Sequence, residues 1–155
     1  MQTLKVGKPA QLTLLLTYTA VILLLTLAFE GRDSGVRTNL QPFESVERLM
    51  ARVQGGEYFS SRVLLIFLGI AGNLVLFAPW AFLTFKFLHG PDRSSLRTHL
   101  DVLLFGLLLS LGVEALQLFL PTRAADVDDV LWNLLGTVTG SLLAQLGQEV
   151  RLEWA

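Results

Sequence analysis

The sequence has no cysteine and only two histidines among its 155 residues. A chain without cysteine forms no disulfide, binds no zinc through thiolates and offers no cysteine nucleophile. Charged residues are also scarce, at 16% of the chain against roughly 25% in an average soluble domain. The net charge of -1 gives no indication of a nucleic-acid partner. These shortages argue against a soluble domain, a disulfide scaffold and a nucleic-acid-binding protein.

Long apolar stretches take the place of the missing charge. Hydrophobic residues make up 52% of the chain, and the mean hydropathy is +0.56. A helix needs about 20 mostly apolar residues to cross a bilayer. Four windows meet that requirement, at about residues 12–29, 63–88, 100–120 and 127–146. We therefore predict an all-α, polytopic membrane protein: a compact bundle of four transmembrane helices in a single domain over residues 1–155.

The orientation of the bundle follows less directly from the sequence. Lys5 and Lys8 precede the first window, but both sides carry equal numbers of basic residues, so the positive-inside rule does not decide by counting. The basic N-terminus, and the acidic residues that match the arginines of the first loop, favour both termini in the cytoplasm. The lack of a small-residue cleavage site favours a retained first helix over a cleaved signal peptide. The first loop and the turn after the third window then lie at the outer face.

The first loop contains one amphipathic segment, at about residues 42–54. Pro42 suits the first position of a helix, and Gly55-Gly56 is a natural stop. Apolar residues recur at helical spacing between them, so we predict a short helix lying in the plane of the membrane interface. Two interpretations stay open for it: a connector packed on the bundle, or a lid over a binding site.

The second window carries one amide and one proline. Pro79 removes the backbone hydrogen bond to Val75 and is expected to kink the helix. Asn73 lies one turn before Phe77 and suits a hydrogen bond to a neighbouring helix, because polar groups within the membrane need partners. Direct contact of Asn73 with a ligand is the alternative.

Most of the polarity of the chain gathers between the third and fourth windows. Ser110, Glu114 and Gln117 are spaced i, i+4 and i+7, so they share one face of a helix. Asp126 is placed to cap the fourth helix, where acidic groups also complement the helix dipole. Ionisable groups in or near membrane segments usually face a cavity or one another. We therefore expect any functional site of the chain to lie here.

The polar region extends into the start of the fourth predicted helix, and small residues follow further along it. Arg123 lies in the turn before it, and Asn133 lies one turn beyond Asp129 on the same side. Further along, Gly136 and Gly140 are spaced four residues apart. Small residues at this spacing let two helices approach closely, so we read these glycines as packing positions and not as chemistry. The spacing suits packing within the chain and a dimer interface equally well.

Three functions fit the polar cluster. In the first, Arg123 pairs with Glu114 or an aspartate and clamps the helical hairpin. In the second, Arg123 holds the phosphate or carboxylate of a headgroup through its planar fork. In the third interpretation Glu114 or Asp129 acts as a general base or as a ligand of a divalent cation. No glycine-rich phosphate loop, paired metal-binding histidines or nucleophile elbow supports catalysis, and no cofactor is evident. His89 and His99 both fall in the second loop, away from the cluster.

Taken in order, these motifs form one series along the chain. They are Asn39-Leu40-Gln41-Pro42-Phe43, then Asn73 with Phe77-Ala78-Pro79, then Ser110, Glu114 and Gln117, then Arg123, Asp126, Asp129, Asn133, Gly136 and Gly140. The series resembles the VanZ-like family of bacterial membrane proteins, and its last block is the most specific. The resemblance covers nearly the whole chain past the first helix. One departure is Ala81, where the family usually has glycine.

The resemblance implies a bacterial plasma-membrane protein, with a family name tied to resistance to the lipoglycopeptide teicoplanin. It supplies no reaction, substrate or cofactor. We expect the protein to bind a membrane lipid or lipid-linked cell-wall precursor and so to alter access by a lipoglycopeptide. There are two alternatives: a membrane enzyme that modifies such a lipid, and a scaffold for partner proteins. The expected ligand-binding residues are Asn39, Asn73, Ser110, Glu114, Gln117, Arg123, Asp126, Asp129 and Asn133, and the expected structural residues are Pro42, Phe43, Phe77, Pro79, Gly136 and Gly140.

Overall fold

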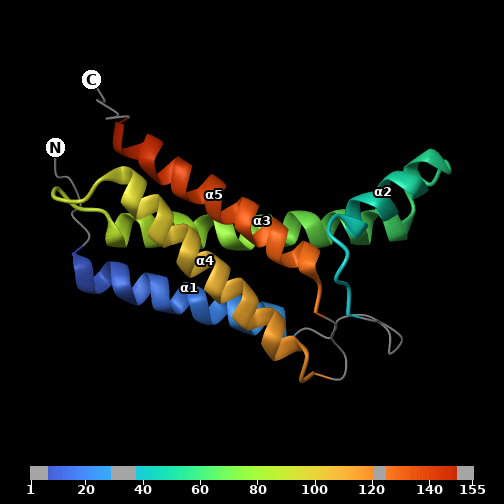
Figure 1. Ribbon diagram of the computed structural model, residues 1–155, viewed down its shortest axis with the longest axis horizontal. Helices are drawn as coiled ribbons and strands as arrows, with labels where there is room; N and C mark the ends of the chain where they lie inside the picture. The colour runs from blue at the N-terminus through green and yellow to red at the C-terminus, as the bar shows by residue number, and fades with distance from the viewer. Residues whose placement is uncertain (1–6, 29–37, 121–124, 150–155) are drawn as a thin grey trace.

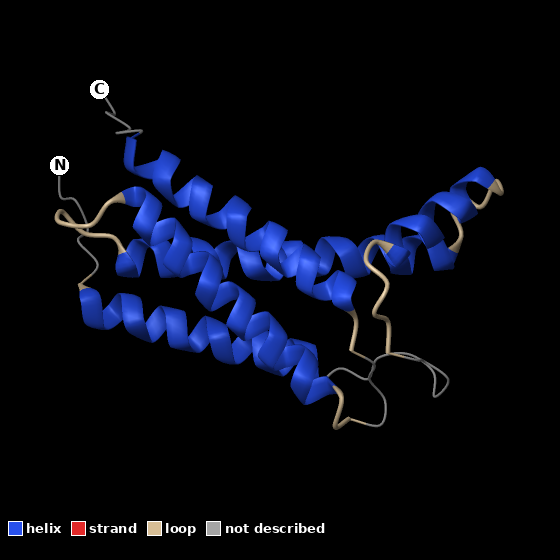
Figure 2. Cartoon of the chain, viewed as in Figure 1, coloured by secondary structure: helices blue, strands red, loops and turns tan. Residues whose placement is uncertain are grey.

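The structure is a computed structural model that describes residues 7–28, 38–120 and 125–149. Its helices are α1 (Lys8–Ala28), α2 (Glu44–Gln54), α3 (Ser61–Leu88), α4 (Ser95–Gln117) and α5 (Val127–Glu149) (Figure 1). Within these ranges there is no strand, only one isolated bridge between Asn39 and Asp126 (Figure 2). The described part of the chain is therefore all-α, as predicted.

Four of the helices, α1, α3, α4 and α5, are long and apolar enough to cross a membrane, which confirms the four predicted spans. Helices α3 and α4 begin earlier than predicted, because Ser60 and Ser94 cap them. The two hydroxyls accept backbone N–H bonds at 3.2 and 3.3 Å. A hydropathy window misses such polar first turns. Helix α4 ends at Gln117 and not at residue 120, because the chain turns there.

Helices α3 and α5 pack backbone to backbone. A Cβ added at Gly136 would lie 2.5 Å from the carbonyl oxygen of Leu74, and one at Gly140 would lie 1.9 Å from that of Ala78. Both contacts are shorter than any real side chain tolerates, so only glycine permits this approach. The prediction that the two glycines are packing positions is confirmed, and the packing is within the chain.

The outer surface of the bundle is largely apolar, whereas its interior contains both an apolar core and buried polar side chains. Its core contains Phe77, Trp80, Phe85 and Val102, all buried. Large side chains such as Leu65 on α3 are 60% exposed along the outer surface, which suits contact with lipid tails and not with water. The chain is a multi-pass membrane protein. Helix α3 runs unbroken through Pro79, and the kink expected there stays a prediction.

Helix α2 packs beside the first turns of α3, and the pair extends beyond the ends of α1, α4 and α5 (Figure 1). We call this end of the bundle the site end. The start of α1 and the end of α5 both lie at the opposite end of the bundle (Figure 1). Helix α2 begins at Glu44, so the prediction that Pro42 occupies the first helical position is wrong. The reason is Phe43, whose φ of 65° is left-handed and separates Pro42 from the helix.

Candidate functional site

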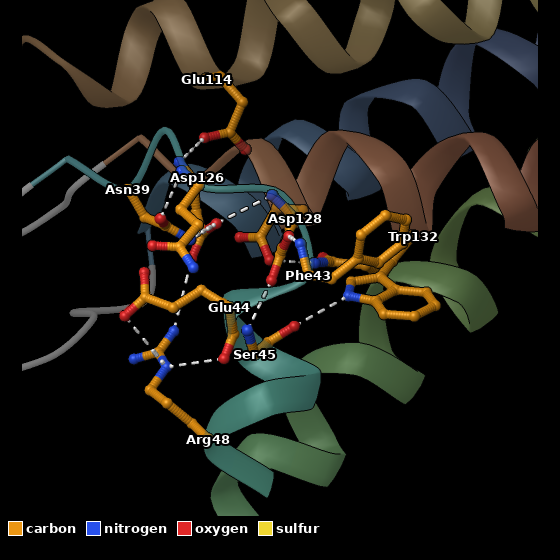
Figure 3. Close-up of polar contacts among 12 residues, drawn as sticks. Asn39, Phe43, Glu44, Ser45, Arg48, Glu114, Asp126, Asp128 and Trp132 are labelled. Carbon is orange, nitrogen blue, oxygen red and sulfur yellow. Dashed lines mark hydrogen bonds and ion pairs between the residues drawn. The ribbon is translucent and has the colours of Figure 1, made fainter. Parts of the chain in front are cut away.

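Asp128 is the most buried carboxylate at the site end, with 1% of its surface exposed. It lies in the first turn of α5, yet its oxygens accept the backbone N–H groups of Phe43 and Ser45 at the start of α2 (Figure 3). The bond to Ser45 is 2.7 Å long. Helix α2 has no side-chain cap of its own. Asp128 therefore caps α2 from another segment and complements its dipole.

Asn39 joins the first loop to the turn before α5. Its N–H donates to the carbonyl of Ala125 at 2.9 Å, and its carbonyl accepts the N–H of Val127 at 3.0 Å. Its side-chain amide donates to Asp126 at 2.7 Å. The same carboxylate oxygen accepts the N–H of Asp128 at 2.9 Å, which is an N-cap. The prediction that Asp126 caps the fourth helix is confirmed, and Asn39 contacts the polar region as expected.

The polar residues of α4 share one buried face, as their spacing predicted, but they serve different neighbours. Glu114 accepts the backbone N–H of Asp126 at 2.8 Å. Ser110 accepts the side-chain amide of Asn133 on α5 at 2.9 Å. The amide of Gln117 donates to a backbone carbonyl of α1, at 3.1 Å. These contacts tie α4 to the turn, to α5 and to α1 in that order.

Asn73 of α3 donates to Asp129 of α5 at 2.6 Å. The predicted hydrogen bond from Asn73 to a neighbouring helix is therefore confirmed. The bond links the two helices near the site end, just before the region where the glycines of α5 meet α3. Hydrogen bonds of this kind between helices are typical of membrane bundles.

A pocket of about 40 Å³ lies between α2, α3 and α5, large enough for more than one water molecule. Its lining residues are Ser45, Arg48, Ile66, Gly69, Ile70, Asp126, Asp129 and Trp132. The side chain of Arg48 is 41% exposed. Its Nε lies 3.6 Å from Oε1 of Glu44, and its Nη2 lies 4.0 Å from Oδ2 of Asp126. The indole N–H of Trp132 donates to the hydroxyl of Ser45 at 3.3 Å. The pocket thus offers a guanidinium, a hydroxyl and two carboxylates beside apolar side chains.

The predicted ligand-binding residues divide between the pocket and the network behind it. Two of them, Asp126 and Asp129, line the pocket. Those that do not line it are Asn39, Asn73, Ser110, Glu114, Gln117 and Asn133. Arg123 lies outside the described residues. Sequence reasoning missed Ser45, Arg48 and Trp132 as pocket residues, because they enter the site only when α2 packs on α3 and α5.

The opposite end of the bundle carries the two histidines. His99 lies within α4 and not in the second loop, so that placement was wrong; Ser94 begins the helix before it. His89 follows α3, and both rings pack against Phe85. Among the described residues, no three His, Cys, Asp or Glu side chains come together to hold a metal ion.

Comparison with protein families matches residues 12–148 to the VanZ/LLP1 family model. The match begins inside α1, whereas the sequence motifs began only at Asn39. The family model therefore also includes most of the first helix. No curated protein and no solved structure matches the chain. The family model covers α2, α3 and α4 in full, most of α1 and all but the last residue of α5. The chain therefore belongs to the VanZ/LLP1 family.

Proposed function

We propose that this protein binds the headgroup of an envelope lipid, or of a lipid-linked cell-wall precursor, in the pocket between α2, α3 and α5. One observation carries the proposal: a guanidinium, a hydroxyl and two carboxylates line one pocket at the end of a bundle whose outer surface is largely apolar. Pockets that combine apolar walls with a few convergent polar groups are the usual form of a ligand site.

The lining favours a headgroup with a phosphate and hydroxyl groups. Arg48 can donate two hydrogen bonds to a phosphate through its planar fork. The carboxylates of Asp126 and Asp129 accept hydrogen bonds from hydroxyls, and the hydroxyl of Ser45 can donate or accept. A glycerol phosphate, or a sugar joined to a lipid through phosphate, has both kinds of group.

We further propose that the site end faces the outside of a bacterial plasma membrane, with both termini in the cytoplasm. The basic N-terminus supports this orientation. The start of α1 and the end of α5 lie at the same end of the bundle, as expected if both termini share one side of the membrane (Figure 1). A lipid or precursor held at the outer leaflet would be less accessible to a lipoglycopeptide such as teicoplanin. Resistance would then follow from binding, without any reaction.

Native mass spectrometry of the purified protein tests the binding function, with phosphatidylglycerol as the probe and phosphatidylcholine as the comparison lipid. Replacement of Arg48 by Ala should weaken binding of phosphatidylglycerol by about tenfold or more, because a charge-assisted hydrogen bond is lost. Arg52→Ala is the matched control: Arg52 lies one turn further along α2 and pairs with Glu57 at 2.9 Å, outside the pocket. Equal affinities for the two lipids in the native protein, or equal losses in the two variants, would contradict the proposal.

Catalysis is the second candidate, favoured by the presence of Asp129 in the pocket lining. Glu114, the other predicted base, does not line this pocket, and one of its oxygens accepts the N–H of Asp126. Lipid extracts of cells that produce the protein separate the two functions. A new lipid species that disappears in Asp129→Asn indicates an enzyme. An unchanged lipid profile with altered teicoplanin susceptibility indicates binding alone.

A further inference from the structure

Gly69 is an unusual member of the pocket lining. It lies on α3 and is exposed, and a Cβ added there would meet no atom within 4 Å. Ile66 and Ile70, at the neighbouring positions of the same helix face, also line the pocket. The wall formed by α3 therefore has a notch at Gly69 between two isoleucines. Nothing in the described part of the chain fills that notch.

The surface of α3 beside the notch is the kind that contacts lipid. Leu65 and Leu68 precede Gly69 by four residues and one residue, and they are 60% and 53% exposed. Both belong to a helix whose composition and length suit a membrane span. The polar pocket thus adjoins an apolar, exposed helix surface, and Gly69 lies where the two meet.

We infer that the ligand of this pocket is a chain-bearing membrane lipid that enters sideways from the leaflet, with its chain lying across Gly69 against Ile66 and Ile70. The inference rests on the proposed function and names the class of ligand. A pocket of about 40 Å³ holds only part of a headgroup, so any chain attached to it must lie outside. A soluble phosphate or sugar would gain nothing from the notch or from the apolar side chains beside it.

Photocrosslinking in lipid nanodiscs tests the inference. The probe is phosphatidylglycerol with a diazirine in its acyl chain, present as a minor component in phosphatidylcholine. Gly69→Leu fills the notch, and Gly72→Leu is the matched control: both glycines lie in α3 with no atom within 4 Å of an added Cβ, but only Gly69 lines the pocket. Leucine is a better helix former than glycine, so both variants should fold. Thermal unfolding of each variant checks this.

The expected result is a yield of crosslinked α3 that falls about tenfold in Gly69→Leu and stays near the native level in Gly72→Leu. An equal yield in native protein and Gly69→Leu overturns sideways entry while the binding function stands. An equal fall in the two variants also overturns it, because the loss is then not specific to the notch. Glycerol phosphate that competes as well as the whole lipid shows that the chain is not recognised. A native protein that binds no phosphatidylglycerol at all contradicts the proposed function itself.

Discussion

Glycines on α3 and α5 play opposite parts in two regions of this molecule. In the middle of the bundle, Gly136 and Gly140 let the backbone of α3 lie where their side chains would be. At the site end, the space that Gly69 leaves is open. A missing side chain therefore serves close packing in one region and leaves room in the other. The residue type alone does not distinguish these roles; the neighbouring atoms do.

The two regions also differ in what holds them together. The middle of the α3–α5 contact depends on close approach of two backbones. At the site end, segments are joined by carboxylates that accept backbone N–H groups, with Asp128 holding α2 and Asp126 holding the start of α5. The middle is closed to a ligand, whereas the site end keeps a pocket beside its polar bonds. Substitutions in the middle should therefore lower the stability of the bundle, whereas substitutions at the site end should loosen the segments that are joined there.

The largest effect is expected at Gly140. Replacement by Ala places a Cβ 1.9 Å from the carbonyl oxygen of Ala78, so α3 and α5 must separate. We expect a loss of stability of about 3 kcal/mol or more, at the upper end of overpacking effects. Thermal unfolding in detergent measures it. Gly112→Ala on α4 is the control, because an added Cβ there meets no atom within 4 Å. A Gly140→Ala protein as stable as the control would disprove the close contact.

A smaller and more local effect is expected at Asp128. Its replacement by Ala leaves the N–H groups of Phe43 and Ser45 without their acceptor, which weakens the attachment of α2 by about 1–3 kcal/mol. Helix α2 should detach more often while the spans stay folded. Because the chain has no cysteine, Ser45→Cys provides a single thiol whose labelling reports this opening. Labelling should be faster with Asp128→Ala than without it. Unchanged labelling would mean that Asp128 does not hold α2.

The smallest effect is expected for the bond between Asn73 and Asp129. A double-mutant cycle with Ala at each position isolates this pair from the other contacts of Asp129. The coupling energy should be about 1 kcal/mol, as for other hydrogen bonds between membrane helices. Unfolding in denaturing detergent supplies the four free energies. A coupling near zero would show that the contact of α3 and α5 at the site end depends on packing alone, as it does in the middle.

The sequence predicted the parts of this structure that depend on local spacing. The four spans follow from the length of the apolar stretches. The shared face of Ser110, Glu114 and Gln117 follows from helical periodicity, and the cap at Asp126 follows from helix-end chemistry. The pocket does not, because its walls come from α2, α3 and α5, whose docking is a tertiary event. Asp128 illustrates the limit: it lies in the first turn of α5, yet its carboxylate caps α2. No local pattern reveals which distant N–H groups a carboxylate will meet.

The central claim is that the site end holds a lipid headgroup in the pocket with its chain across Gly69. The most direct measurement is an electron cryo-microscopy map of the protein in nanodiscs containing phosphatidylglycerol. The account predicts density for a phosphate beside Arg48, continuous with a chain that crosses α3 between Ile66 and Ile70. A map in which Arg48 fills the pocket and closes on Asp126, with no lipid density at Gly69, would contradict it.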